Sequence, residues 1–183
     1  ICIFTNTGQL HTVKLQDVPF GKFRDKGVPI DNISNYDSQK EYAITVESQT
    51  SLNLYRILFV TAQAMMKIVD GGEFDVAKRT VAATKLQDND EVISVEIIRE
   101  QKQVILQSAE GYFLRFGLEE VPEKKKSAVG VRGMKLSDKD HVEAVYYTLA
   151  AMPDPDIVYK DKHVELQRIK PQHRDSKGTK LRL

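Results

Sequence analysis

The chain has 183 residues, of which 41% are apolar and 29% charged, and its formal net charge is +1. This composition is typical of a globular protein with enough residues for a sizeable core, and it excludes an intrinsically disordered chain. No apolar run approaches the ~20 residues of a membrane span, and the single cysteine, Cys2, excludes an intrachain disulfide.

The first predicted elements form one supersecondary unit. A hairpin is expected over 1–15, because β-favouring residues flank the turn sequence NTGQ. A loop broken by proline and glycine follows over 16–27, then a short strand over 28–33 and a longer strand over 42–48. The chain starts without methionine inside a strand-like run, so we expect it to be a piece cut from a longer protein.

The same order of elements then returns. Each later unit has a predicted hairpin, a polar loop, a short strand, a turn rich in aspartate and, in two cases, a long strand. The last unit stops at KGTKLRL, where its third strand is expected, so it is either incomplete or takes a strand from elsewhere. The hairpins are predicted at 55–69, 104–116 and 157–169, the short strands at 80–86 and 131–136, and the long strands at 91–98 and 141–149.

A sequence repeat explains this order. The segment LQDNDEV at 86–92 returns as LSDKDHV at 136–142, and a third related copy lies at 25–37. A period of about 50 residues indicates one supersecondary unit used several times. We divide the chain, as a single domain 1–183, into repeats at approximately 1–48, 55–98, 102–149 and 156–183.

The strand lengths decide the fold class. Strands of about five residues, turns every 8–12 residues and no amphipathic helix longer than a turn or two predict an all-β repeat protein. A flat array of such units would leave open sheet edges. Radial closure leaves only short, protected edges, so we predict a propeller-like disc of four-stranded blades, with about four blades in this chain.

The aspartate turns do not indicate a metal or catalytic site. Asp88 and Asp90, like Asp138 and Asp140, follow a strand at a turn, where aspartate caps backbone N–H groups. The four histidines are scattered without ligand spacing, and no nucleophile elbow or phosphate-binding loop is present. We therefore predict that this chain is not itself an enzyme and holds no cofactor or metal.

The basic loops are the repeated feature that points to a function. Each unit places lysine and arginine just ahead of its short strand, so closure would gather them into a belt on the rim of the disc. Such a belt would contact the phosphates of duplex DNA, favour bent DNA and bind less tightly as salt rises. The predicted DNA-binding residues are Lys22, Arg24, Lys26, Lys78, Arg79, Arg115, Lys124, Lys125, Lys126, Arg132, Arg174 and Lys177.

Two other interpretations remain. Charge runs are often no more than solvated loops, in which case the chain would be a propeller-like protein-interaction scaffold whose partners dock on a face. An enzyme with its own active site is the least supported, and it would need a deep pocket lined by converging ionisable groups.

Three segments carry a resemblance to a known family. FTNTGQLHTVKLQDVPFGKFRDKGVPI, KRTVAATKLQDNDEV and AVGVRGMKLSDKDHV resemble blades of the C-terminal domain of the A subunit of bacterial type IIA topoisomerases, DNA gyrase and topoisomerase IV. The resemblance covers nearly the whole chain. It implies a β-pinwheel, whose blades exchange strands with their neighbours and whose basic perimeter binds and bends duplex DNA.

The resemblance also implies a setting. The domain would present DNA to the N-terminal catalytic part of the same subunit, with an ATPase B subunit in the holoenzyme, in the bacterial cytoplasm at the nucleoid and without a membrane. ATP and Mg would act through other domains, and none of the seven tyrosines takes the role of the family's nucleophile. The gyrase-specific heptapeptide Gln-Arg-Arg-Gly-Gly-Lys-Gly is absent from this sequence, which favours topoisomerase IV over gyrase.

Overall fold

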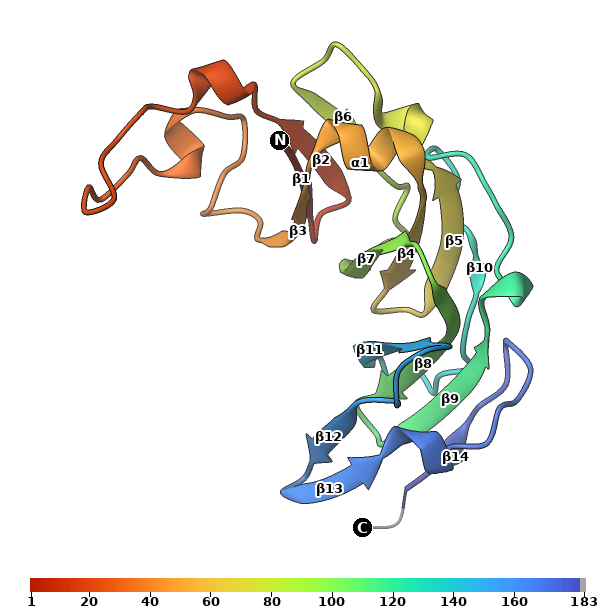
Figure 1. Cartoon of the computed structure of the whole chain (residues 1–183). Helices are drawn as coiled ribbons and strands as arrows, with labels where there is room; N and C mark the ends of the chain where they lie inside the picture. Colours follow the sequence, from red (N-terminus) through yellow and green to blue (C-terminus); the bar gives the residue numbers. More distant parts are fainter. Residues whose placement is uncertain (182–183) are drawn as a thin grey trace.

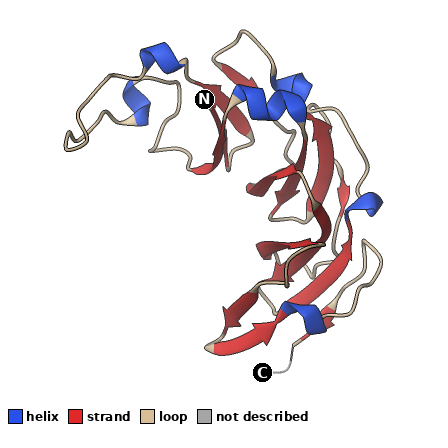
Figure 2. Ribbon diagram, in the orientation of Figure 1, coloured by secondary structure: helices blue, strands red, loops and turns tan. Residues whose placement is uncertain are grey.

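The computed structural model describes residues 1–181, and its strands form three four-stranded antiparallel sheets and one two-stranded hairpin. The sheets follow one another along an arc from the N-terminal sheet to the C-terminal hairpin, and the arc stays open within these residues (Figure 1). Figure 2 shows strands throughout, with only short helical turns between them. The predicted all-β class and four-stranded blades are confirmed.

Each sheet takes three strands from one repeat and its fourth from the next. The orders are β3-β1-β2-β6, β10-β5-β4-β7 and β11-β8-β9-β14. The first sheet contains β1 (Cys2–Thr5), β2 (Gln9–Thr12), β3 (Ala43–Glu47) and β6 (Thr80–Ala82). The second contains β4 (Arg56–Thr61), β5 (Met65–Asp70), β7 (Val92–Ile98) and β10 (Val131–Arg132). The third contains β8 (Gln101–Ser108), β9 (Tyr112–Gly117), β11 (Val142–Leu149) and β14 (Thr179–Lys180), and the hairpin consists of β12 (Asp156–Tyr159) and β13 (Lys162–Glu165).

The exchanged strand lies in the same place in every blade. It pairs with the second hairpin strand in one register, because Leu10 faces Val81, Met66 faces Val131 and Phe113 faces Thr179. Each short strand therefore satisfies its backbone hydrogen bonds on the preceding repeat. The end of the fourth repeat becomes β14 of the third blade, and the strand exchange implied by the resemblance is present three times.

Helical turns connect the strands. A 3₁₀ turn follows the second hairpin strand in all four repeats, and the one α-helix among residues 1–181 is a six-residue segment between β3 and β4 that the sequence did not reveal. The helical elements are η1 (Leu15–Asp17), η2 (Ile30–Asn32), α1 (Gln49–Leu54), η3 (Gly71–Phe74), η4 (Leu118–Glu120) and η5 (Leu166–Arg168). None of these helices is long and apolar enough to cross a bilayer.

The core lies between neighbouring blades. Phe4 of the first sheet meets Phe59 and Phe74 of the second repeat, with ring centroids 5.7 and 5.3 Å away. A second cluster joins the second and third sheets around Met66 and Phe116, and a third joins the last sheet to the hairpin. The apolar faces of successive sheets thus bury one another, as sheet packing requires.

The sequence prediction fails at residues 28–33. No strand forms there, and η2 occupies part of the segment. A strand needs a partner for its backbone groups, and no strand within residues 1–181 pairs with this segment.

The second aspartate of each turn has the structural role that was predicted. Asp90 accepts a hydrogen bond from the backbone N–H of Gln63, and Asp140 accepts one from that of Glu110, both at 2.9 Å. Each carboxylate ties its turn to the hairpin of the same repeat. Among the described residues, no group of histidine, cysteine, aspartate and glutamate side chains could hold a metal ion.

Candidate nucleic-acid interface

Three loops cross from one blade back to the preceding one, and they carry most of the predicted basic residues. They cover residues 71–79, 118–130 and 166–178, and each begins with a 3₁₀ turn and ends at the exchanged strand. In Figure 1 they are yellow-green, teal and blue, and they follow the convex side of the arc. We call them the crossing loops. Equivalent sequence positions therefore recur along one curved edge.

Backbone hydrogen bonds fix each crossing loop to the blade that it crosses. Ile68 donates its N–H to the carbonyl of Pro122 at 3.1 Å and accepts from the N–H of Lys124 at 2.8 Å. One repeat later, Gln172 donates to the carbonyl of Arg115 at 2.8 Å. The loops thus continue the sheet edge as irregular strands, which limits the positions that their side chains can take.

A glutamate in the 3₁₀ turn of the preceding repeat accepts a backbone hydrogen bond from each of the last two crossing loops. Glu73 accepts from the N–H of Lys126 at 3.0 Å, and Glu120 accepts from the N–H of Arg174 at 2.9 Å. The cationic side chains return to the turn, since Lys126 and Arg174 donate to the carbonyls of Glu73 and Glu120 at 2.7 and 2.9 Å. Burial opposes the charge on Glu73, but the Lys126 N–H and the Lys125 ammonium, 3.2 Å away, hold its pKa below the usual value.

A buried lysine holds the second crossing loop from below. Lys67 of β5 is fully buried, and its Nζ donates to the carbonyls of Lys125, Lys126 and Ala128 at 3.0, 2.8 and 2.6 Å. Desolvation lowers the pKa of Lys67 to about 8, while the charge of Glu73 acts in the opposite direction. At neutral pH the ammonium is therefore the charged donor that binds three carbonyls of the segment that carries Lys124, Lys125 and Lys126.

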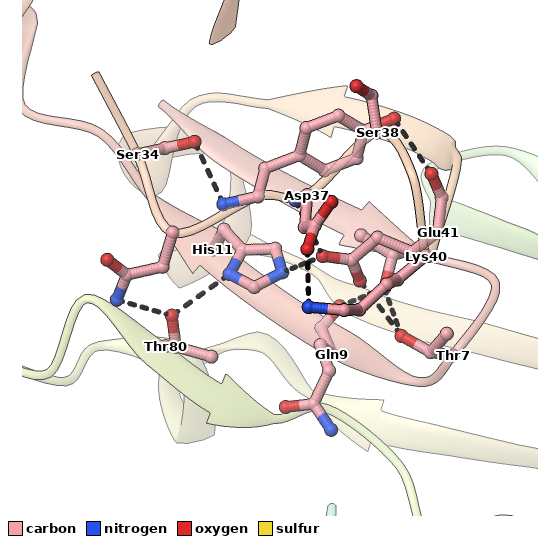
Figure 3. Close-up of polar contacts among 12 residues, drawn as sticks. Thr7, Gln9, His11, Ser34, Asp37, Ser38, Lys40, Glu41 and Thr80 are labelled. Atoms are coloured by element: carbon pink, nitrogen blue, oxygen red, sulfur yellow. Dashed lines mark hydrogen bonds and ion pairs between the residues drawn. The ribbon is translucent and has the colours of Figure 1, made fainter. Parts of the chain in front are cut away.

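His11 occupies the corresponding position in the first blade. Its imidazole lies between Thr80 of the exchanged strand and Glu41, at 2.9 and 2.7 Å (Figure 3). Glu41 also accepts from the Thr7 hydroxyl at 2.9 Å and from the backbone N–H of Asp37 at 3.2 Å. Burial opposes ionisation of Glu41, yet these hydrogen bonds and His11 keep its pKa below the usual value. A buried polar group thus anchors the exchanged segment in two successive blades.

The twelve predicted cations fall into three groups. Six are exposed and form no ion pair with any residue in 1–181: Lys22, Arg24, Lys26, Lys78, Lys124 and Lys177. Five are held by carboxylates or turn carbonyls of neighbouring segments: Arg79, Lys125, Lys126, Arg132 and Arg174.

The last of the twelve, Arg115, is used inside the fold. It is largely buried, forms an ion pair with Asp154 at 2.6 Å and donates to Gln103 at 2.7 Å. Its charge is therefore neutralised between the third sheet and the last repeat, and we leave it out of the interface. The sequence pattern also missed Lys67 and Glu73, because periodicity alone assigns lysine and glutamate to the surface.

A broad hollow of about 1090 Å³ lies between the turns of the second and third repeats. Its lining includes Asp90, Asp140 and His141, but both aspartates already cap backbone N–H groups. Carboxylates held in this way serve the turns, so the hollow offers no nucleophile and base in mutual contact. We assign no reaction to it.

Comparison with known proteins agrees with this geometry. The sequence matches the family described as "DNA gyrase C-terminal domain, beta-propeller" over residues 1–38, 55–99 and 102–148. The DNA gyrase A subunit of Lawsonia intracellularis (strain PHE/MN1-00) is 31% identical over 146 residues, which are 79% of this chain and 18% of that protein.

Two solved structures share the fold. The crystal structure of the C-terminal domain of DNA topoisomerase IV has a TM-score of 0.81 and 24% identity, covering 97% of this chain and 57% of that one. The DNA gyrase A C-terminal domain has a TM-score of 0.74 and 24% identity, covering 97% and 58%. This chain thus spans less than a fifth of the gyrase protein that it matches and over half of each solved domain.

Proposed function

Because the chain belongs to the DNA gyrase C-terminal domain family, the C-terminal domain of the type IIA topoisomerase A subunit, we propose that it binds duplex DNA along its convex edge. We propose further that it bends the DNA that it binds. The observation that carries the proposal is the recurrence of cationic crossing loops at one position of three successive repeats along a curved edge. Local ion pairs hold some of these cations in place, while others are exposed and form no ion pair within residues 1–181.

The chemistry of the edge fits phosphates better than bases. Lysine and arginine on irregular loops supply charge and hydrogen bonds to a backbone, whereas sequence readout needs a helix or ribbon inserted in a groove. Each neutralised phosphate contributes about −0.9 to the slope of log affinity against log salt, so contacts from the six unpaired cations alone would give a slope of about −5. Cations along the whole of a curved edge can contact phosphates of one duplex only if the duplex bends to follow that edge.

The proposal extends to the whole protein. We assign this domain the role of presenting DNA to the N-terminal catalytic part of the same subunit, alongside an ATPase B subunit, with ATP and Mg used by those other parts in the bacterial cytoplasm. The absence of the heptapeptide Gln-Arg-Arg-Gly-Gly-Lys-Gly from this sequence supports the topoisomerase IV side of the family.

The direct test is fluorescence anisotropy of a labelled duplex titrated with the chain between about 50 and 200 mM salt. We expect affinity to fall steeply with salt and to fall further, for any DNA sequence, when Lys124, Lys125 and Lys126 are all replaced by alanine. The matched control changes three exposed lysines outside the crossing loops, Lys85, Lys102 and Lys139, and removes the same charge. Equal loss in both variants, or salt-insensitive binding, would favour the protein-interaction scaffold instead.

A further inference from the structure

The convex edge contains two junctions between an exchanged strand and the crossing loop of the next blade, and they are built differently. At the second junction, between β10 and the third crossing loop, Arg132 donates two hydrogen bonds to the carboxylate of Asp175. The backbone closes the same junction, since Asp175 donates its N–H to the carbonyl of Gly133 at 2.7 Å and Lys135 donates to that of Ser176 at 2.9 Å. The third crossing loop is therefore joined directly to β10.

The first junction, between β6 and the second crossing loop, lacks these contacts. The strand register places Ala82 of β6 where Arg132 lies in β10, and it places Ser127 of the second crossing loop where Asp175 lies in the third. Alanine and serine cannot form an ion pair. Among residues 1–181, no backbone hydrogen bond joins β6 to the second crossing loop. Small side chains thus stand where the second junction has an ion pair.

An open groove of about 760 Å³ occupies the first junction. Residues 76–78 and 80–82 line one side of it, and Lys126 and Ser127 line the other. Apart from Lys78 and Lys126, the lining side chains are short ones of valine, alanine, threonine and serine, and no aspartate or glutamate of the described chain is among them. The groove therefore combines two cations with a small apolar surface and an exposed hydroxyl.

The second crossing loop keeps its position without a closed junction because Lys67 binds its carbonyls from below. The third blade has Leu114 in place of Lys67. The glycines show this equivalence: a Cβ at Gly130 would lie 3.2 Å from the Cβ of Lys67, and one at Gly178 would lie 3.1 Å from that of Leu114. Each loop thus has an anchor that the other lacks, a buried ammonium in one and an ion pair across the junction in the other. The lysine anchor leaves the first junction open.

We propose that this groove binds the sugar–phosphate backbone of one strand of duplex DNA. The inference rests on the proposed DNA binding and adds a defined position for the duplex on the edge. Lys78 and Lys126 contact phosphates, the Ser127 hydroxyl donates to a phosphate oxygen, and the alanine and valine side chains lie against deoxyribose carbons. At the second junction the Arg132–Asp175 ion pair occupies the equivalent place, so the duplex passes over that junction without entering it.

The surroundings of the groove favour duplex DNA over an acidic protein segment. Lys124 lies on the same crossing loop and Lys177 on the next, and both are exposed without an ion pair in residues 1–181. An extended anion that follows the edge meets these cations as well as those of the groove. A short acidic peptide would meet the groove alone.

The test transfers the residues of the second junction to the first, as Ala82→Arg together with Ser127→Asp. The net charge stays the same, so a change in affinity reports access to the groove. We expect at least ~10-fold weaker binding of a labelled duplex at about 100 mM salt, with a salt slope shallower by about 2, because two phosphate contacts are lost. Ala82→Gln with Ser127→Gln fills the groove without charge, and we expect the same loss from it whether or not the ion pair forms.

The matched control is Ala150→Gln with Ala151→Gln, two exposed alanines between β11 and β12, and we expect unchanged affinity from it. Wild-type affinity in both filled variants, with circular dichroism showing that they are folded, overturns the groove and leaves DNA binding elsewhere on the edge intact. An unchanged chain that does not bind DNA at all overturns the proposed function, and this inference with it.

Acetylation of lysine side chains, measured by mass spectrometry, gives an independent result. Saturating duplex is expected to protect Lys78 and to leave Lys102, an exposed lysine of β8, reactive. Lys78 that stays as reactive with duplex as without it contradicts the proposal. Protection of Lys78 by a polyglutamate peptide but not by duplex would assign the groove to an acidic protein segment and overturn it.

Discussion

Replacing Lys67 by methionine is expected to release the second crossing loop while the blades stay folded. The Lys67 ammonium donates three hydrogen bonds of 2.6 to 3.0 Å, and bonds from a charged donor contribute about 1.5–3 kcal/mol each. Against this, the fall of the pKa from 10.5 to about 8 means that burial costs the charged form about 3 kcal/mol. The difference leaves a loss of about 3 kcal/mol in the free energy of unfolding, and methionine adds little cavity cost because it fills most of the same volume.

The pH dependence of this effect has a definite sign. The pKa of Lys67 is lower in the folded chain than in the unfolded one, so between pH 8 and 10.5 the unfolded state binds the extra proton. Stability from this group therefore rises with pH across that window. The rise is expected in the wild-type chain and absent in Lys67→Met.

Urea unfolding followed by circular dichroism measures the global loss, and hydrogen exchange localises it. The informative amides are those of Lys124 and Ala128, which donate to the carbonyls of Ile68 and Lys125. Lys102→Met, at an exposed lysine, is the matched control. Unchanged exchange at both amides together with wild-type stability would refute the assigned role of Lys67. A second readout is DNA affinity, where Lys67→Met should add no further loss once the three loop lysines have been removed.

Other predictions concern the first exchange and the packed glycine. Glu41→Gln is expected to make the free energy of unfolding less dependent on pH in the acid range. The pKa of Glu41 is depressed in the fold, so its contribution to stability is present above the unfolded pKa and is lost as pH falls through the folded pKa. An acid dependence identical to that of the wild-type chain would argue against an anchoring role for the His11–Glu41 contact. In the 183-residue chain Gly130→Ala should destabilise by several kcal/mol, because both positive φ and the Met66 carbonyl oppose a Cβ. Gly27→Ala should cost about 1 kcal/mol from φ alone, and thermal unfolding that ranks the two variants equally would contradict this.

The repeat made much of the fold predictable. The spacing of the turn sequences set the number of strands and their order, and the aspartates after each strand identified turns by their capping chemistry. The positions of the basic loops followed from the same spacing. Local sequence could not reveal which sheet a short strand joins, because Val81 and Val131 read equally well as members of their own repeat.

Two buried cations have structural roles that the sequence pattern does not reveal. Lys67 and Arg115 look like surface cations in a strand pattern, but their partners come from segments far along the chain, Ala128 and Asp154 among them. A buried charge is stable only when such partners surround it, and a single sequence does not show them. The strand predicted at residues 28–33 failed for the opposite reason. The segment has a strand-like composition, but no strand within the described chain pairs with it.

The central claim is that the convex edge bends the duplex that it binds. It is tested most directly by energy transfer between dyes at the two ends of a duplex of about 40 base pairs, at low salt. The account predicts that the ends approach when the 183-residue chain binds, and that the approach is lost when Lys124, Lys125 and Lys126 are replaced by alanine. Saturable binding that leaves the distance between the ends unchanged would contradict it.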